Sequence, residues 1–202
     1  MLKAIMALGL YLAFVVVAVG WRSWFQYRRT KDHGLRLLSG QSSRMEWTAA
    51  LLLTGGAVLA GAAPLADLAR FIAPFAPLAV PWFTSAGLVL GLLGFAGTLM
   101  AQLQMGDSWR IGVDNHETTP LIQVGLFRSV RNPIFSSMLL AAAGLLFLVP
   151  NALSVAALGS LFAGVEIQVR QVEEPYLARI HGNGFLSYAR KVGRFIPRIG
   201  CL

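Results

Sequence analysis

Residues 134–169 read IFSSMLLAAAGLLFLVPNALSVAALGSLFAGVEIQV, two apolar runs that meet at Pro150-Asn151. Glu166 is the one charged residue in this stretch. Because Pro-Asn between two apolar runs is typical of a turn, we expect residues 134–149 and 152–169 to form an antiparallel helical hairpin. Each run is near the lower limit for a helix that crosses a bilayer, which takes about 20 residues.

The remainder of the chain is also strongly apolar. Of its 202 residues, 56% are hydrophobic and only 13% are charged, and the mean hydropathy is +0.63. A soluble domain usually carries about 25% charged residues. Three further helix-length apolar runs precede the hairpin, at residues 4–21, 47–65 and 82–103. The sequence therefore predicts an all-α integral membrane protein with about five transmembrane helices.

Small residues and prolines punctuate these runs. Glycines recur every three or four residues in the third run, which places them on one stripe typical of a helix–helix contact: Gly87, Gly91, Gly94 and Gly97. A second small-residue face lies in the second run: Gly55, Gly56, Ala60 and Gly61. The connector between the two runs is dense enough in prolines to prevent a continuous helix: Pro64, Pro74, Pro77 and Pro81.

The positive charges predict an orientation. Fifteen of the 17 Lys and Arg residues lie in residues 22–45, 103–133 and 170–198, which leaves Lys3 and Arg70 for the other side. Positive residues concentrate in cytoplasmic segments. We therefore expect the C-terminus and both basic loops in the cytoplasm and the N-terminus outside. Positive residues also follow the first run directly, which predicts a retained helix rather than a cleaved signal peptide.

The net charge of +8 raises the question of nucleic acid. The charges flank apolar runs, so we interpret them as membrane-flanking and expect no nucleic-acid partner. The three histidines show no metal-ligand spacing and no cysteine lies near them, so we expect no metal site. Oligomeric state is not encoded in any feature of the sequence.

Polar residues gather in two segments, 104–133 and 170–198, on the predicted cytoplasmic side. The hairpin brings the two segments together, which predicts a pocket that is apolar on one side and wet on the other. Residues from Arg170 onward alternate apolar and charged side chains, as in a helix lying at a membrane surface. Arg170 and Glu174 are four residues apart and should share one helix face.

Trp109 and Arg110 follow the third run. A tryptophan beside an arginine at the end of a membrane helix is typical of an interface anchor, and a place in the pocket wall is the alternative. Arg128 and Arg131 offer planar forks that bind carboxylates. Glu173 and Glu174 are adjacent, so on a helix they point about 100° apart and can have different roles. The residues alone predict a membrane protein with a cytoplasmic pocket, without specifying a reaction.

The motifs in the C-terminal half resemble a known family. Gly125-Leu126-Phe127 followed by Arg131-Asn132-Pro133-Ile134-Phe135 resembles the Gly-Pro-Tyr … Arg-His-Pro-x-Tyr segment of the isoprenylcysteine carboxyl methyltransferases and related membrane phospholipid methyltransferases. A second block resembles the family's Glu-Glu, Leu, Phe-Gly, Tyr-x-x-Tyr and Arg-Phe-x-Pro pattern: Glu173-Glu174, Leu177, Gly182, Phe185, Tyr188 and Arg194-Phe195-Ile196-Pro197. The resemblance covers roughly residues 104–198.

This resemblance implies a methyltransferase that uses S-adenosylmethionine and releases S-adenosylhomocysteine. The acceptor would be a lipophilic small molecule or a lipidated substrate that enters from the bilayer, and membrane lipids would be partners. The chain would form one membrane domain, with helices in residues 1–103 and the cofactor-binding loop, hairpin and C-terminal cap in residues 104–202.

The resemblance also implies site residues. The expected catalytic residues are Arg131, Arg170, Glu173 and Glu174, an arginine to hold a carboxylate acceptor or a glutamate to take a proton from an amine or thiol. The expected cofactor-binding residues are Gln123, Val124, Gly125, Leu126, Asn132, Pro133, Phe135, Leu177, Tyr188, Phe195 and Pro197. We expect Glu173→Gln and Arg131→Ala to abolish methyl transfer while the protein stays folded.

The sequence departs from the family pattern at three side chains in particular. Asn132 stands in place of the family's histidine, Phe135 in place of a tyrosine, and Phe185 in place of the first tyrosine of the second block. Asparagine can still hydrogen-bond a cofactor, whereas the acceptor and the attacked atom stay open. Two alternatives remain: an NADPH-dependent membrane sterol-type reductase, and a membrane binding protein without catalysis.

Overall fold

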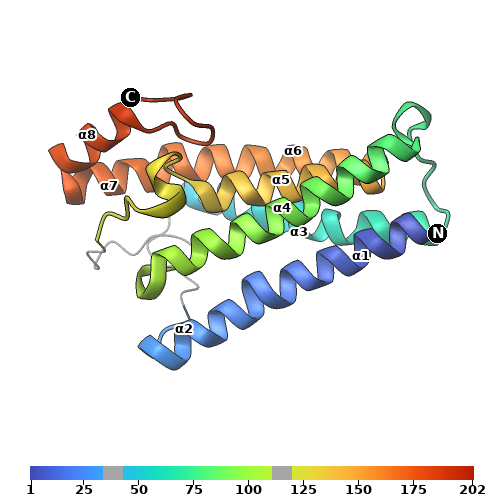
Figure 1. The fold of residues 1–202 in the computed structure, drawn as a ribbon, viewed down its shortest axis with the longest axis horizontal. Helices are drawn as coiled ribbons and strands as arrows, with labels where there is room; N and C mark the ends of the chain where they lie inside the picture. The colour runs from blue at the N-terminus through green and yellow to red at the C-terminus, as the bar shows by residue number, and fades with distance from the viewer. Residues whose placement is uncertain (34–42, 111–119) are drawn as a thin grey trace.

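The computed structural model describes residues 1–33, 43–110 and 120–202, which form a helical bundle without a strand (Figure 1). The α-helices are α1 (Leu2–Phe14), α2 (Arg22–Thr30), α3 (Arg44–Leu68), α4 (Pro81–Met105), α5 (Pro133–Leu148), α6 (Ala152–Ile167), α7 (Glu174–His181) and α8 (Asn183–Lys191). Two π-helical turns are η1 (Val15–Trp21) and η5 (Gln168–Glu173), and three 3-10 turns are η2 (Ala76–Leu78), η3 (Gly106–Ser108) and η4 (Gly125–Arg128).

Four helices are long and apolar enough to cross a membrane. They are Leu2–Thr30, Arg44–Leu68, Pro81–Ser108 and Ala152–His181, while α5 is a shorter apolar helix. The all-α class predicted from the sequence is thereby confirmed, and the four apolar helices suggest a membrane protein. The N-terminus and the C-terminus lie at opposite ends of the bundle (Figure 1). The number of spans and their orientation remain predictions.

α4 and α5 pack along the predicted glycine stripe. A Cβ atom on Gly94 would lie 2.3 Å from the backbone nitrogen of Ala141, and one on Gly144 would lie 2.3 Å from that of Gly91. These distances leave no room for a side chain, so the two backbones approach each other directly. Such close approach is how small residues bring helices together in a bilayer, and the helix–helix contact predicted for this stripe is confirmed.

α3 packs against α6 and the first helix through its own small residues. A Cβ on Gly56 would lie 2.7 Å from the Leu161 side chain, and one on Gly61 would lie 2.7 Å from the Tyr11 ring. The Tyr11 hydroxyl donates to the Ala57 carbonyl at 3.0 Å. The small face predicted on this helix is therefore confirmed at these two glycines, whereas Gly55 faces open space.

The predicted interruption between the second and third runs is confirmed, since α3 ends at Leu68 and α4 begins at Pro81, but Pro64, grouped with the connector prolines, lies inside α3. The side chain is buried, and the helix continues to Leu68. A transmembrane helix tolerates such a proline because neighbouring helices supply hydrogen bonds. The carbonyl left without a helix donor by Pro64 is that of Ala60, while the Asn151 amide donates to the adjacent Ala63 carbonyl at 3.1 Å and ties α3 to the hairpin turn.

The hairpin turn forms where Pro150-Asn151 predicted it. Asn151 is completely buried and caps α6: its side-chain oxygen accepts from the Ser154 backbone N–H at 3.0 Å, and the Ser154 hydroxyl oxygen accepts from the Asn151 N–H at 3.1 Å. This reciprocal pair satisfies donors that a helix start leaves without partners. The two hairpin helices pack mainly on outer neighbours, α5 on α4 and α6 on α3.

Residues 170–181 correct a second prediction. They do not form a separate surface helix but prolong α6, through η5 and α7, into one continuous helix that ends at His181. Gly182 then adopts a φ of +49°, a left-handed conformation that glycine adopts at little cost. The chain turns there, and only α8 is a separate amphipathic helix.

The C-terminal segment folds back on the start of α5. The Arg131 and Asn132 backbone N–H groups donate to the Gly193 and Arg194 carbonyls at 2.8 and 3.1 Å. The Ser136 hydroxyl donates to the Phe195 carbonyl at 2.7 Å. These bonds fasten residues 192–200 across one end of the bundle, which brings the two polar segments of the sequence together.

Candidate functional site

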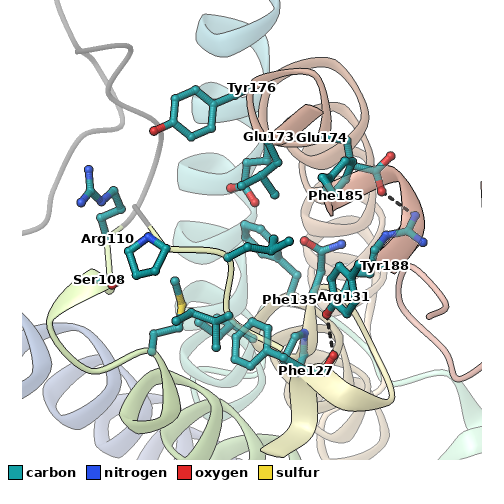
Figure 2. A pocket seen from close by; sticks show the side chains of 18 residues that line it. Ser108, Arg110, Phe127, Arg131, Phe135, Glu173, Glu174, Tyr176, Phe185 and Tyr188 are labelled. Atoms are coloured by element: carbon teal, nitrogen blue, oxygen red, sulfur yellow. Dashed lines mark hydrogen bonds and ion pairs between the residues drawn. The ribbon is translucent and has the colours of Figure 1, made fainter. Parts of the chain in front are cut away.

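A cavity of about 980 Å³, counted with its open mouth, lies at the polar end of the bundle (Figure 2). Its walls come from the end of α4, the loop before α5, the first turn of α5, η5, α7 and α8. The lining residues named from the sequence are Arg131, Asn132, Pro133, Phe135, Glu173, Glu174, Leu177 and Tyr188. A mixed apolar and polar lining of this kind is typical of small-molecule sites.

The adjacent carboxylates Glu173 and Glu174 point in different directions. Figure 2 shows Glu173 directed into the cavity, while Glu174 turns toward Arg131. Glu173 is the last residue of the π-turn η5, whose wider turn sets the face that follows. The Gln168 amide donates to Glu173 Oε1 at 3.2 Å. Glu173 is therefore the carboxylate available to a bound molecule.

Glu174 is buried between two arginines. Arg131 Nη2 lies 2.7 Å from its Oε1, and Arg194 donates through Nε and Nη2 to its two oxygens, both at 2.8 Å. The hydrogen bond with Glu174 holds the pKa of Arg194 above its ordinary value. Two positive charges and one negative charge leave this cluster with a net positive charge at the edge of the cavity.

Arg131 also binds the C-terminal segment. Its Nη1 donates to the Ala189 and Val192 carbonyls at 2.8 and 2.5 Å, and its Nη2 donates to the Gly200 carbonyl at 3.0 Å. With these bonds and the ion pair, its guanidinium is used mainly to hold the fold together. The expectation that Arg131→Ala leaves the protein folded is therefore revised.

Two of the expected cofactor-binding side chains are fixed by hydrogen bonds. The Asn132 amide donates to the Arg194 carbonyl at 3.2 Å. The Tyr188 hydroxyl donates to the Phe127 carbonyl at 2.5 Å (Figure 2). Burial raises the pKa of Tyr188 to about 12, so its hydroxyl remains a neutral donor at any physiological pH. These bonds connect α8 and the C-terminal segment to the cavity wall.

Arg170 does not reach the cavity. Its guanidinium forms an ion pair with Glu166 and is half exposed. The pair expected from spacing, Arg170 with Glu174, is not formed. Arg170 lies in the π-turn η5 and Glu174 directly follows it, so the i to i+4 rule of an α-helix does not place the two side chains on one face.

Several other expected cofactor-binding residues lie behind or beside the cavity wall. Gln123, Val124 and Gly125 are exposed, and the Leu126 N–H is occupied by a 2.8 Å hydrogen bond to Gln104 Oε1. In the C-terminal segment, Phe195 is half-buried and Pro197 is exposed. None of these six lines the cavity.

The cavity also contains residues that sequence reasoning did not assign to it: Met105, Ser108, Pro120, Leu121, Ile122, Phe127, Ile134, Tyr176 and Phe185. Arg110 lines the cavity as well, as one of its two sequence interpretations allowed. Trp109 is buried in the protein, with 1% exposed, so its interpretation as an interface anchor is wrong. Asp114, His116 and Glu117 of the same polar stretch lie outside the described residues.

A second cavity, of about 770 Å³ counted with its open mouth, lies further along the bundle. Its lining is almost wholly apolar and comes from the first helix, α3, α5 and α6. Ile134 lines the first cavity and Met138, one turn further along α5, lines the second. The two cavities therefore follow one another along the same face of α5.

The chain matches a family model described as phospholipid methyltransferase over residues 82–184. The matched region contains α4, the hairpin and α7, and thus most of the cavity wall. No curated protein and no solved structure gives a significant match. On the family match, which spans half of its length, the chain belongs to the phospholipid methyltransferase family of isoprenylcysteine carboxyl methyltransferase-like membrane enzymes.

Proposed function

We propose that this protein transfers a methyl group from S-adenosylmethionine to a lipophilic acceptor that enters from the bilayer. The observation that carries the proposal is a polar-ended cavity with an inward carboxylate, Glu173, inside the region that matches the methyltransferase family. The family suggests lipid substrates. The same match favours methyl transfer over the sterol-type reduction that the sequence left as an alternative.

The residues of the first cavity fit this cofactor. Aromatic and aliphatic walls suit an adenine ring, and they include Phe127, Phe135 and Phe185. Asn132 and the net positive cluster around Glu174 suit the amino-acid end. When bound, the cofactor would supply a methyl group on a sulfonium, ready for in-line displacement.

The chain's own contribution is positioning and the handling of one proton. The hydrogen-bonded Tyr188 and Asn132 hold the wall in place, which favours a fixed approach of the reacting atoms. With an amine or thiol acceptor, Glu173 would accept the proton that the acceptor loses as its nitrogen or sulfur gains the methyl group. A carboxylate acceptor has no proton to lose, and an arginine would orient it.

The second cavity supports a lipophilic acceptor. A head group in the first cavity and a hydrocarbon chain in the second would lie along one face of α5, past Ile134 and Met138. A hydrocarbon chain in this cavity would have surroundings as apolar as those it has in the bilayer. The polar end of the same molecule would meet Glu173 and Arg110, which both line the first cavity.

Calorimetric titration of the purified protein in detergent tests the cofactor. We expect saturable binding of S-adenosylhomocysteine and none of NADPH. Binding of NADPH alone would transfer the proposal to a reductase, and binding of neither by protein with an intact thermal transition would remove the enzymatic proposal. The acceptor class is then tested by incubation with methyl-labelled S-adenosylmethionine and total membrane lipids, where label must appear in the organic extract.

A further inference from the structure

The first helix, Leu2–Thr30, contributes no residue to the first cavity, the one that contains Glu173, yet it carries one of the most buried charged side chains among the described residues. Arg22 is 1% exposed. Its Nη2 donates to the Gly106 carbonyl at 2.6 Å, and its Nη1 donates to Gln26 Oε1 at 2.9 Å. Its guanidinium lies 4.6 Å from the centre of the Trp109 ring. Arg22 thus binds the segment that follows α4 through a hydrogen bond and a cation–π contact.

Neighbouring residues add further contacts between the first helix and the end of α4. The Gln26 amide donates to the Asp107 carbonyl at 2.6 Å, and Arg29 Nε lies 2.8 Å from Asp107 Oδ1. One turn before the end of α4, the Gln102 amide donates to the Ala18 carbonyl at 2.9 Å. The first helix is therefore tied to residues 102–109 by side chains from both partners.

The residues that contact the first helix are interleaved along the chain with residues of the cavity wall. Gly106, Asp107 and Trp109 hold the first helix, as described above. Their neighbours Met105, Ser108 and Arg110 line the cavity. Figure 2 shows Ser108 and Arg110 on the side of the cavity opposite Glu174 and Arg131. Any shift of residues 106–109 must therefore move this wall.

We propose that Arg22 is a positioning residue, which sets the cavity wall formed by Met105, Ser108 and Arg110 without touching the ligands. This inference rests on the proposed function for its ligand readout. It assigns a role in the site to the first helix, which lies outside the region that matches the family.

Lysine cannot replace arginine in this role. The guanidinium has a planar fork that spans two acceptors and a flat face that stacks on an aromatic ring, whereas an ammonium is a compact point charge. Arg22→Lys therefore keeps the charge that orients a membrane helix and removes the paired hydrogen bonds and the stacking on Trp109. Arg28 provides the matched control, because it lies on the same helix and is exposed. Among the described residues its one side-chain contact is with the Trp24 ring.

The experiment compares Arg22→Lys, Arg22→Ala and Arg28→Ala with the wild type. S-adenosylhomocysteine affinity is measured by calorimetry, and backbone hydrogen exchange is followed by mass spectrometry. We expect both Arg22 variants to bind about tenfold more weakly, as a displaced wall predicts, and to exchange faster at residues 105–110. Exchange in α5 and α6 should stay as in wild type in both Arg22 variants. The melting transition should fall for Arg22→Ala, whose truncation leaves a buried cavity, and stay closer to wild type for Arg22→Lys, while Arg28→Ala should match wild type throughout.

Two outcomes would overturn the inference. One is an Arg22→Lys variant with wild-type affinity and wild-type exchange at residues 105–110, because charge alone would then suffice. The other is faster exchange over the whole bundle, which would make Arg22 a general stability residue. If the wild type itself binds no S-adenosylhomocysteine, the proposed function fails, and hydrogen exchange at residues 105–110 still decides whether Arg22 sets this wall.

Discussion

Two glutamates that are neighbours in sequence have different surroundings. Glu174 is buried and accepts hydrogen bonds from Arg131 and Arg194, so both of its oxygens are occupied. Glu173 has a single amide donor, Gln168, and points into the cavity. A carboxylate with spare acceptor capacity can exchange a proton with a ligand, while one held by two guanidinium groups stays ionised. The two residues should therefore respond differently to the same substitution.

Glu173→Gln should reduce methyl transfer to an amine or thiol acceptor by at least about 100-fold, the lower end of what general-base catalysis contributes. S-adenosylhomocysteine affinity should stay close to that of the wild type. Glu166→Gln is the matched control, since Glu166 lies on the same helix and pairs with Arg170 away from the cavity. Equal turnover of the two variants would show that Glu173 takes no proton.

Glu174→Gln should act on stability instead. Removal of one partner of a buried ion pair costs roughly 3–5 kcal/mol because the other charge is left uncompensated, and here two arginines are affected. We expect a loss of about 3 kcal/mol in the free energy of unfolding, measured by denaturation in detergent, and faster proteolysis of residues 192–202. A variant as stable as Glu166→Gln would contradict the structural role of this cluster.

At the scale of elements, the second cavity makes a prediction about lipid chains. Ala142→Leu adds bulk to its wall on α5, whereas Ala156→Leu adds the same bulk to an exposed position on α6. A phospholipid with a diazirine in one acyl chain should label residues 138–145 in the wild type on illumination. We expect Ala142→Leu to lower this labelling several-fold and Ala156→Leu to leave it unchanged.

Equal labelling in all three proteins would mean that the chain contacts the outside of the bundle. The melting transition of each variant separates a blocked cavity from a misfolded bundle, because overpacking itself costs about 1–3 kcal/mol.

The sequence predicted the elements well where one physical effect dominates. The glycine stripe of α4 and the turn at Pro150-Asn151 formed as expected, because a stripe of small residues marks a packing face whatever its partner, and a helix cap depends on residues three apart. Pro64 was grouped with the connector prolines but lies inside α3, because a proline alone does not determine where a helix ends. The π-turn η5 has no sequence signal of its own, so the spacing of Arg170 and Glu174 gave the wrong pair.

The candidate site was predictable in part for the same reason. The first cavity is lined by motif residues at the start of α5, on α7 and on α8, for example Asn132, Leu177 and Tyr188. The loop at residues 123–126 does not, because its backbone is packed on Gln104. Ser108 and Arg110 flank residues that the first helix contacts from more than 80 residues earlier in the chain, and spacing along the sequence carries no information about such contacts.

At the scale of the whole molecule, the orientation in the membrane is open to a direct test. Cys201 is the single cysteine and is exposed. With the C-terminus in the cytoplasm, a membrane-impermeant maleimide should label it only after cells are permeabilised. In a Cys201→Ser background, a cysteine in place of the exposed Leu2 should be labelled in intact cells. The reverse pattern would invert the topology, and labelling of both from one side would require an even number of spans.

The π-turn at Gln168–Glu173 shifts the phase of the helix that carries it. One extra residue within a helix rotates everything that follows by about 100°, so the segment before the turn faces α3 in one register and the segment after it faces the cavity in another. Deletion of a single residue here would barely change length, charge or hydropathy, yet it would swing the Glu173 carboxylate out of the cavity. Related sequences without the extra residue must be aligned with a gap at this turn, or their carboxylates will be paired with the wrong glutamate.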